Sequence, residues 1–218
     1  MSLEENIIEI YGNRINKEEI YNSVYSELAD LEKQKKIKKI TSDFIKITSD
    51  TTILEIGAGQ GGNIPLLLKM GFNETNIYLN ELLPERISAL QRNYPNIKLF
   101  EGNALTVNFK LKFDIIFQST VFTSILNKND RITLATKMWD LLNPSGIILW
   151  YDFIYDNPKN KNVKKVSVLE VKKIFEKATK SKIIKTTLAP PIGRRVGKLY
   201  HFFNLPFLRS HILAVFQK

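Results

Sequence analysis

Hydrophobic positions along the chain follow two periods. From Ile15 to about Lys46, apolar residues recur at three- and four-residue steps, which is the pattern of an amphipathic helix. After residue 51, short apolar runs rich in β-branched residues alternate with further helical stretches, and such runs are typical of strands buried on both faces. The predicted strands span residues 52–56, 76–80, 97–100, 113–117, 147–151, 183–188 and 211–216, and the later helices span 64–70, 84–94, 130–142 and 167–178.

Strands that alternate with helices predict an α/β fold, with an open, Rossmann-like sheet of seven mostly parallel strands and right-handed crossovers. No long helix separates the last two predicted strands, so the seventh strand is expected to return antiparallel beside the sixth. We expect the chain to have two parts. Residues 1–46 form an N-terminal helical cap, which begins near a capping box of Asn16 and Glu19, and residues 47–218 form the sheet domain.

The first predicted strand leads into a glycine turn and then into a helix. Glycines allow a tight turn and let the backbone approach a ligand without a Cβ in the way. Asn63 and Pro65 suit the start of the helix over 64–70, and Gly71 suits its end. Ligands of open α/β sheets bind beyond the carboxyl ends of the strands, so residues 57–62 predict a nucleotide site.

The glycine spacing alone does not identify the nucleotide. Gly57, Gly59 and Gly62 satisfy the G-x-G-x-x-G dinucleotide pattern, and Glu81 lies 19 residues further on, where it could bind a ribose. Glu55 changes the picture, because an apolar strand usually excludes a carboxylate unless something pairs with it. Residues 55–61, Glu-Ile-Gly-Ala-Gly-Gln-Gly, resemble motif I of the class I S-adenosylmethionine-dependent methyltransferases. An NAD(P) site remains the alternative.

The resemblance implies the class I methyltransferase fold and S-adenosylmethionine as cofactor. It places Glu81 on the ribose hydroxyls and the neighbouring Leu82 on the adenine. Gly102-Asn103-Ala104 resembles the family's Gly-Asp-Ala turn, in which the Asn103 side-chain carbonyl would accept from the adenine amino group. Gln118 follows the fourth strand, where the family has its motif IV. The implied cofactor-binding residues are Glu55, Gly57, Ala58, Gly59, Gly61, Glu81, Leu82, Asn103, Ala104 and Gln118.

Two further patterns concern the methyl acceptor. The Asp/Asn/Ser-Pro-Pro-aromatic pattern of adenine and glutamine N-methyltransferases is absent after the fourth strand, which disfavours methylation of nucleic acid bases at an amino group. Residues 150–158, 188–194 and 205–211 resemble a bacterial class I subgroup linked to surface polysaccharide and secondary metabolism. That resemblance implies a small-molecule or glycan-linked acceptor, with a hydroxyl as the favoured methylated group.

A hydroxyl acceptor can require a base. The candidates are Asp152, which ends the fifth strand, and His201, which lies between the last two strands. Tyr25 on the N-terminal helix and Arg194 are the candidate acceptor-binding residues, with the Arg194 guanidinium suited to an anionic group. His211 is expected to be a structural residue at the start of a strand.

Composition excludes several other classes of site. The chain of 218 residues has no cysteine, so disulfides, thiolate metal sites and cysteine nucleophiles are ruled out. Only two histidines are present, which disfavours a histidine-rich metal site. The sequence shows neither a signal peptide nor a long apolar run, so a cytoplasmic protein without a transmembrane segment is expected.

Charge is unevenly distributed, and it keeps two other functions open. Residues 157–218 contain 15 Lys or Arg and 2 Asp or Glu, whereas residues 1–156 contain 17 and 20. The basic third could bind RNA as a methylation substrate. Alternatively, the apolar stretch 199–203 with its flanking cations could make the protein a non-catalytic cofactor-binding or membrane-surface module. The simplest interpretation is a solvated basic surface, and the lysines over residues 33–39 are also expected to face solvent.

Overall fold

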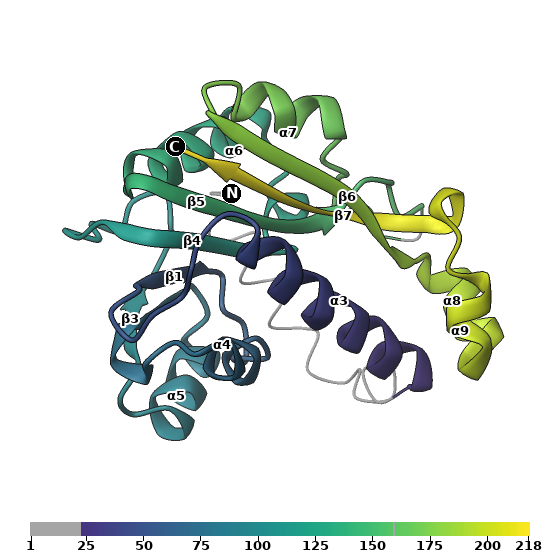
Figure 1. Cartoon of the computed structure of the whole chain (residues 1–218), viewed down its shortest axis with the longest axis horizontal. Coiled ribbons are helices and arrows are strands. Elements are labelled where there is room, and N and C mark those ends of the chain that lie inside the picture. The colour runs from purple at the N-terminus through teal and green to yellow at the C-terminus, as the bar shows by residue number, and fades with distance from the viewer. Residues whose placement is uncertain (1–22, 159) are drawn as a thin grey trace.

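The computed structural model describes residues 23–158 and 160–218 (Figure 1). The predicted capping box at Asn16 and Glu19 lies outside these residues. Seven strands form one sheet in the order β3-β2-β1-β4-β5-β7-β6, and all neighbours are parallel except β7, which is antiparallel to both β5 and β6. The strands are β1 Ile53–Ile56, β2 Ile77–Glu81, β3 Lys98–Glu101, β4 Phe113–Ser119, β5 Leu142–Phe153, β6 Lys180–Leu188 and β7 Arg209–Gln217.

Helices pack on both faces of the sheet, and short 3-10 turns connect several elements. The helices are α3 Val24–Ser42, α4 Ile64–Met70, α5 Pro84–Asn93, α6 Lys128–Asp140, α7 Val168–Ile174, α8 Pro190–Val196 and α9 Tyr200–Phe203, and the 3-10 turns are η1 Glu74–Asn76, η2 Phe122–Ser124, η3 Gly197–Leu199 and η4 Pro206–Leu208. None of the helices in the described part of the chain is long and apolar enough to cross a membrane.

The predicted antiparallel last strand is confirmed. β7 lies between β5 and β6, and the side chains of residues 210–216 are all buried. A connection of two short helices returns the chain from β6 at the same end of the sheet, and such a short return requires an antiparallel strand. The fold is therefore the seven-stranded α/β arrangement expected from the sequence, with a helix, α3, preceding the sheet.

The alternation of side chains along each strand divides the core into two layers. Leu54, Ile148 and Trp150 face α6 and α7 on one side of the sheet. Their sequence neighbours Ile53 and Leu149 face α3, α4 and α5 on the other side. This division matters at the end of β5, where neighbouring residues reach different environments.

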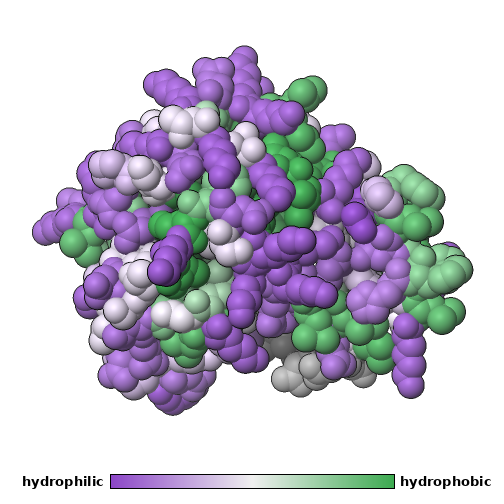
Figure 2. Space-filling view, viewed as in Figure 1, coloured by the Kyte–Doolittle hydropathy of each residue, from purple (hydrophilic) through white to green (hydrophobic). Residues whose placement is uncertain are grey.

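Element boundaries differ from the prediction where tertiary pairing extends a strand. β5 begins at Leu142 instead of Ile147, because Leu142 already pairs with Phe113 of β4 across a register shift. Helix α7 ends at Ile174, earlier than predicted. Hydrophilic side chains cover most of one face of the molecule, and hydrophobic side chains gather at its right end, over α8 and α9 (Figure 2).

Candidate active site

A cavity of about 550 Å³ lies at the carboxyl ends of β1, β2 and β4. Its wall contains the loops that follow these strands, together with Asp30 and Lys33 of α3. Most of the residues predicted to bind a cofactor are brought together here. Those in the cavity wall are Glu55, Gly57, Ala58, Gly59, Glu81, Leu82, Asn103 and Ala104, whereas Gly61 and Gln118 are not in it.

The glycines of the turn after β1 are required for different physical reasons. Gly57, Gly59 and Gly61 all have positive φ angles, of 66°, 61° and 81°. A Cβ on Gly57 would lie 2.6 Å from a methyl group of Val121, so side-chain packing also excludes one there. A Cβ on Gly59 would meet only the tip of Arg86, at 3.9 Å, because this residue borders the cavity.

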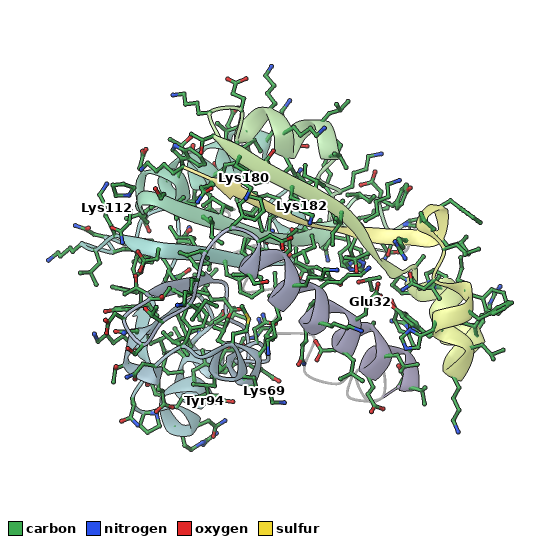
Figure 3. The ribbon with its side chains drawn as sticks, in the orientation of Figure 1. Glu32, Lys69, Tyr94, Lys112, Lys180 and Lys182 are labelled. Carbon is green, nitrogen blue, oxygen red and sulfur yellow. The ribbon has the colours of Figure 1, made fainter. Side chains whose placement is uncertain are left out.

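Gly61 is not in the cavity wall, and it is required for packing behind the turn. A Cβ on Gly61 would lie 2.8 Å from Ile64 and 2.9 Å from Leu90, both of which are buried. The motif glycine predicted to contact the cofactor therefore lets α4 and α5 close against the turn. Figure 3 labels Tyr94 in this region, and its ring lies 3.2 Å from the same hypothetical Cβ.

Glu55 is buried at the base of the cavity with only part of its hydrogen-bonding capacity used. Asn63 Nδ2 donates to Glu55 Oε1 at 2.6 Å, and Glu55 Oε2 has no partner in the described structure. Burial raises the pKa of Glu55 to about 7, and the Asn63 hydrogen bond and the Lys33 charge oppose that rise. An unsatisfied buried carboxylate oxygen at a cavity suits a cationic ligand group.

Asn63 differs from the prediction in what its side chain does. It stands at the N-cap position of α4 but makes no side-chain capping bond. Its amide group donates to Glu55, and its Oδ1 accepts from Lys33 Nζ at 3.0 Å. Asn63 thus connects the buried carboxylate to a lysine of α3, and this connection has no signal in the sequence.

Glu81 is held at the cavity edge by backbone amides. Its Oε2 accepts from Gly59 N at 2.6 Å, and its Oε1 accepts from Leu82 N and Leu83 N at 2.9 and 3.0 Å. These bonds fix the carboxylate between the glycine turn and the loop after β2. Asn103 also borders the cavity, but its Oδ1 accepts from Leu105 N at 3.0 Å in the turn after β3.

Gln118 does not reach the cavity wall, contrary to the predicted contact. Its Oε1 accepts from Val121 N at 3.1 Å and its Nε2 lies 3.4 Å from the Tyr151 carbonyl oxygen. The side chain is fully buried. Gln118 therefore supports the loop over residues 119–121 from beneath, because both ends of its amide are used inside the protein.

A second cavity of about 740 Å³ adjoins the first. The two share Asp30, Lys33, Ser119 and Thr120 in their walls, so the loop after β4 and one turn of α3 separate them. The predicted acceptor-binding residues Tyr25 and Arg194 line this second cavity. The other wall residues were not predicted as site residues, and those from the last three strands are Tyr151, Phe153, Thr187 and His211.

His211 and Tyr151 form one wall of the second cavity. Their rings stack with centroids 4.9 Å apart and planes 16° apart. Ser210 Oγ lies 3.0 Å from His211 Nδ1, and burial lowers the His211 pKa to about 3, so the imidazole is neutral near pH 7. The Tyr151 hydroxyl lies 2.8 Å from Thr187 Oγ1, and burial raises the pKa of Tyr151. His211 is in a strand as predicted, but it also faces the cavity.

Asp152 and His201, the predicted bases, border neither cavity. The Asp152 carboxylate is buried and accepts from Thr123 Oγ1 and from the Phe153 amide, both at 2.8 Å. Burial raises its pKa to about 6. Alternation along β5 explains the misplacement, because Tyr151 and Phe153 face the second cavity whereas Asp152 points through the opposite face. His201 is exposed on α9.

Two wall residues of the second cavity hold an unfavourable backbone conformation. Thr120 and Thr187 have φ angles of 61° and 60°, in the left-handed region that β-branched residues rarely adopt. Thr120 directly follows Ser119, the last paired residue of β4, and Thr187 lies within β6 at a gap in its pairing with β7, between Thr186 and Leu188. Such strain persists only where the surrounding structure imposes it, and it is typical of functional sites.

Comparison with known proteins identifies the domain that contains the first cavity. Residues 53–146 match the family model described as a methyltransferase domain. A proposed sarcosine dimethylglycine methyltransferase from Galdieria sulphuraria has a TM-score of 0.68 at 14% identity, with 99% of this chain and 98% of that chain covered. The N-methyltransferase NodS from Bradyrhizobium japonicum WM9, in complex with S-adenosyl-L-homocysteine, has a TM-score of 0.68 at 12% identity, with 98% of each chain covered.

The glycopeptide N-methyltransferase MtfA, complexed with S-adenosyl-L-methionine, has a TM-score of 0.58 at 12% identity, with 85% of this chain and 94% of that chain covered. None of the curated proteins matches the chain in sequence. The chain contains a class I methyltransferase domain. S-adenosylmethionine is the cofactor of this methyltransferase, and the dinucleotide alternative is set aside. Its predicted fold and enzyme class are confirmed.

Helix α3 borders both cavities of the methyltransferase. Lys33 forms an ion pair with Asp30 at 2.9 Å and lies 5.8 Å from the centre of the Tyr151 ring. The sequence predicted that Lys33 faces solvent, and this prediction was wrong. Nothing in the sequence distinguishes Lys33 from the other lysines of the helix, because its role depends on where α3 crosses the sheet.

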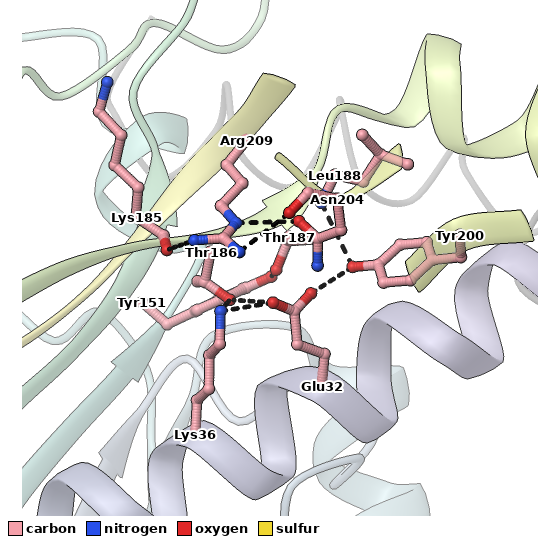
Figure 4. A network of polar contacts seen from close by, with 10 residues as sticks. All are labelled: Glu32, Lys36, Tyr151, Lys185, Thr186, Thr187, Leu188, Tyr200, Asn204 and Arg209. Carbon is pink, nitrogen blue, oxygen red and sulfur yellow. Dashed lines mark hydrogen bonds and ion pairs between the residues drawn. The ribbon is translucent and has the colours of Figure 1, made fainter. Parts of the chain in front are cut away.

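A polar network fixes α3 to the carboxyl end of β6 (Figure 4). Glu32 accepts hydrogen bonds from Lys36, from the Thr186 hydroxyl and from the Tyr200 hydroxyl of α9. Tyr200 in turn accepts from Leu188 N at 3.2 Å. The network holds α3, which borders the second cavity, against β6 and α9. None of its donors was predicted as a site residue.

Proposed function

We propose that this methyltransferase transfers the methyl group of S-adenosylmethionine, bound in the first cavity, to a hydroxyl group of a small-molecule or glycan-linked acceptor bound in the second. The observation that supports this proposal is the shared wall of the two cavities, formed by Asp30, Lys33, Ser119 and Thr120. Adjacent cavities would place the acceptor oxygen next to the methyl group that the cofactor supplies.

In this proposal the first cavity holds the cofactor through groups already in position. Glu81 would accept from the ribose hydroxyls, and the free oxygen of Glu55 would accept from the methionine ammonium group. Gly57 and Gly59 let the backbone lie close to the methionine part, and Leu82, Asn103 and Ala104 border the adenine. The bound cofactor supplies the electrophilic methyl group.

The chain's own contribution is chiefly positioning. Orientation of two reactants can lower a barrier by roughly 7–11 kcal/mol. Tyr25 and Arg194 would hold the acceptor from the α3 and α8 sides, and the neutral His211 would accept a hydrogen bond from the acceptor hydroxyl. Because the His211 pKa is low, the proton released on methylation would pass to water and not stay on the imidazole. His211 replaces Asp152 and His201 as the residue that orients the nucleophile, because it is the histidine that reaches the cavity. Residues 1–46 act as a cap over the domain of residues 47–218.

An amino group is the second candidate acceptor. The printed names of NodS and MtfA describe N-methyltransferases, and these proteins share the fold of this chain. An amine acceptor must arrive uncharged at the methyl group, and a cavity with a neutral imidazole does not oppose that state. The product of the reaction distinguishes the two candidates.

Calorimetry with S-adenosylhomocysteine tests the cofactor part of the proposal. We expect binding to the folded protein, and no binding at millimolar ligand would refute the proposal. Acceptors are then screened with activated sugars, lipid-linked sugars, small phenols and small amines, and products are identified by mass spectrometry. Methylated hydroxyls support the first candidate, and methylated amines alone support the second.

A matched pair of variants tests the second cavity once an acceptor is found. Arg194→Ser should raise the KM for an anionic acceptor by roughly tenfold, because an exposed charged hydrogen bond is lost. Arg195→Ser removes the neighbouring guanidinium, which does not line the cavity, and should leave KM unchanged. Equal effects of the two variants would show that the acceptor binds elsewhere.

A further inference from the structure

The segment from α8 to η4 projects from one end of the sheet and exposes an unusual set of apolar side chains (Figures 1 and 2). We call residues 190–208 the α8–η4 tip. Phe202 is 78% exposed and Phe207 73% exposed, and Leu199 and Leu205 are 60% and 44% exposed. Exposed aromatic and aliphatic residues at this density mark an interaction surface more often than a solvated one.

The charge of the same segment has a single sign. Residues 189–210 contain Arg194, Arg195, Lys198 and Arg209 and no Asp or Glu. Arg209 is committed to Asn204, to which it donates at 2.9 Å. The other three cations are exposed, and none forms an ion pair with a residue that the structure describes. The tip therefore presents apolar side chains beside uncompensated positive charge.

The exposed residues stand on a rigid base. Tyr200, between Leu199 and Phe202, is fully buried and bonded to Glu32 and to Leu188 N. Beneath α8, Gly193 packs so tightly that a Cβ would lie 2.1 Å from the Tyr25 ring. The outward direction of the apolar side chains is thus set by packing, and their exposure is a fixed property of the tip.

We propose that the α8–η4 tip binds the surface of an anionic lipid bilayer. Phe202, Phe207 and Leu199 would enter the boundary between headgroups and acyl chains, while Arg195 and Lys198 would contact lipid phosphates. A bilayer matches both features, because it accepts aliphatic as well as aromatic side chains at a negatively charged surface. Single-stranded nucleic acid matches less well, since leucine side chains gain nothing from base stacking.

Docking in this way would place the second cavity near the lipid surface. Pro190 and Arg194 of α8 belong to the wall of that cavity, so the tip and the proposed acceptor site share an element. Binding at the tip would hold the acceptor cavity close to the lipid surface. The surface itself is inferred from exposure and charge alone, and it does not depend on the proposed methyl transfer.

Co-sedimentation of the full chain with vesicles tests the proposal. We expect binding to phosphatidylcholine vesicles that contain phosphatidylglycerol, weaker binding as salt is raised, and little binding to phosphatidylcholine alone. Leu199→Asp and Phe202→Asp should each lower the partition coefficient by roughly tenfold. Leu169→Asp is the matched control, because Leu169 is 79% exposed on the distant helix α7, and it should leave partitioning unchanged.

Three outcomes would overturn the proposal. The first is that the wild-type protein does not bind anionic vesicles. The second is that Leu169→Asp weakens vesicle binding as much as Leu199→Asp. The third is that Leu199→Asp abolishes self-association in sedimentation equilibrium, or retention on single-stranded RNA, without changing vesicle binding. Binding of S-adenosylhomocysteine by each variant shows that it is folded, so failure at the vesicle is separable from failure of the proposed enzyme activity.

Discussion

The two cavities are built from the chain in different ways. The first takes its wall mostly from loops that directly follow β1, β2, β3 and β4, so each residue is placed by its own strand and turn. The second takes its wall from α3, the end of β4, β5, β6, β7 and α8, and its wall residues extend from Tyr25 to His211. Local motifs specify the first cavity, whereas tertiary packing specifies the second.

This difference explains why a cofactor site can be constant on a fold while acceptor sites vary. A change in the angle of α3 or α8 would reshape the second cavity and leave the glycine turn and Glu81 in place. The same difference makes the two cavities separable by mutation. Substitutions in one cavity should change its affinity for its ligand, or the packing around it, with little effect on the other cavity.

The largest expected effect is that of Glu81→Ala on cofactor affinity. The change removes a carboxylate held by three backbone amides and, with it, the proposed acceptor for both ribose hydroxyls. Affinity for S-adenosylhomocysteine should fall by about 3–4 kcal/mol, or several hundred-fold, by calorimetry. Glu101→Ala is the control, because Glu101 pairs in register with Glu81 at the end of β3 but does not border the cavity.

The same calorimetric assay compares Glu81, at the end of β2, with Asp152, near the end of β5. Asp152→Ala removes a carboxylate bonded to Thr123 and Phe153, away from both cavities, and should change cofactor affinity less than about threefold. Should Asp152→Ala weaken binding more than Glu81→Ala, the assignment of the cofactor to the first cavity would be wrong.

Stability of the cofactor half should depend on Gly61. Gly61→Ala places a Cβ 2.8 Å from Ile64 at a φ of 81°, so strain and overpacking together should lower the free energy of unfolding by about 3 kcal/mol in urea titrations. Gly62→Ala is a matched control, because Gly62 has no atom within 4 Å of the added Cβ and no positive φ. Equal stability of the two variants would mean that the turn can relax.

Sequence could predict residues of the first cavity but not most residues of the second. Glu55, Gly57 and Glu81 were predictable because a strand, a turn and an acid at its end are local features. Lys33, Thr187 and His211 were not, because each enters the second cavity only through the way distant elements pack.

Two errors within predicted elements have equally simple causes. Asp152 was assigned from its position at a strand end, but the strand's alternation decides which face the carboxylate takes. Asn63 was assigned as a capping residue, but its Oδ1, the atom that would cap α4, accepts from Lys33, and its amide group donates to the buried Glu55. In both cases the predicted element was right, and the surroundings of the side chain determined its role.

Buried Glu55 should give the cofactor-free protein a pH dependence of stability. Its pKa of about 7 is above the ordinary 4.5, so folding favours the protonated form, and stability falls as pH rises from about 4.5 to 7. Glu55→Gln removes this loss and should be more stable than the wild type above pH 7 by up to about 3 kcal/mol. Urea titrations at several pH values measure the difference, and a difference that does not change with pH would contradict the assignment.

His211 in the second cavity should show the opposite sign. Its pKa of about 3 is below the ordinary 6.5, so folding favours the neutral imidazole, and stability falls as pH drops below 6.5. Between pH 6.5 and 5 the wild type should lose about 2 kcal/mol relative to His211→Gln. If the two stability curves stay parallel over this range, His211 is more accessible to water than its packing against Tyr151 and Phe153 indicates.

The smallest expected loss of stability concerns the network that holds α3 against the second cavity (Figure 4). Tyr200→Phe removes the donor to Glu32 and the acceptor for Leu188 N, which should cost about 1–2 kcal/mol of unfolding free energy. Cofactor affinity should not change, because Tyr200 borders neither cavity. Tyr155→Phe at an exposed position is the control. A loss of cofactor affinity in Tyr200→Phe would show instead that α3 couples the two cavities. Lys33 would carry that coupling, because it follows Glu32 in sequence and lies in the walls of both cavities.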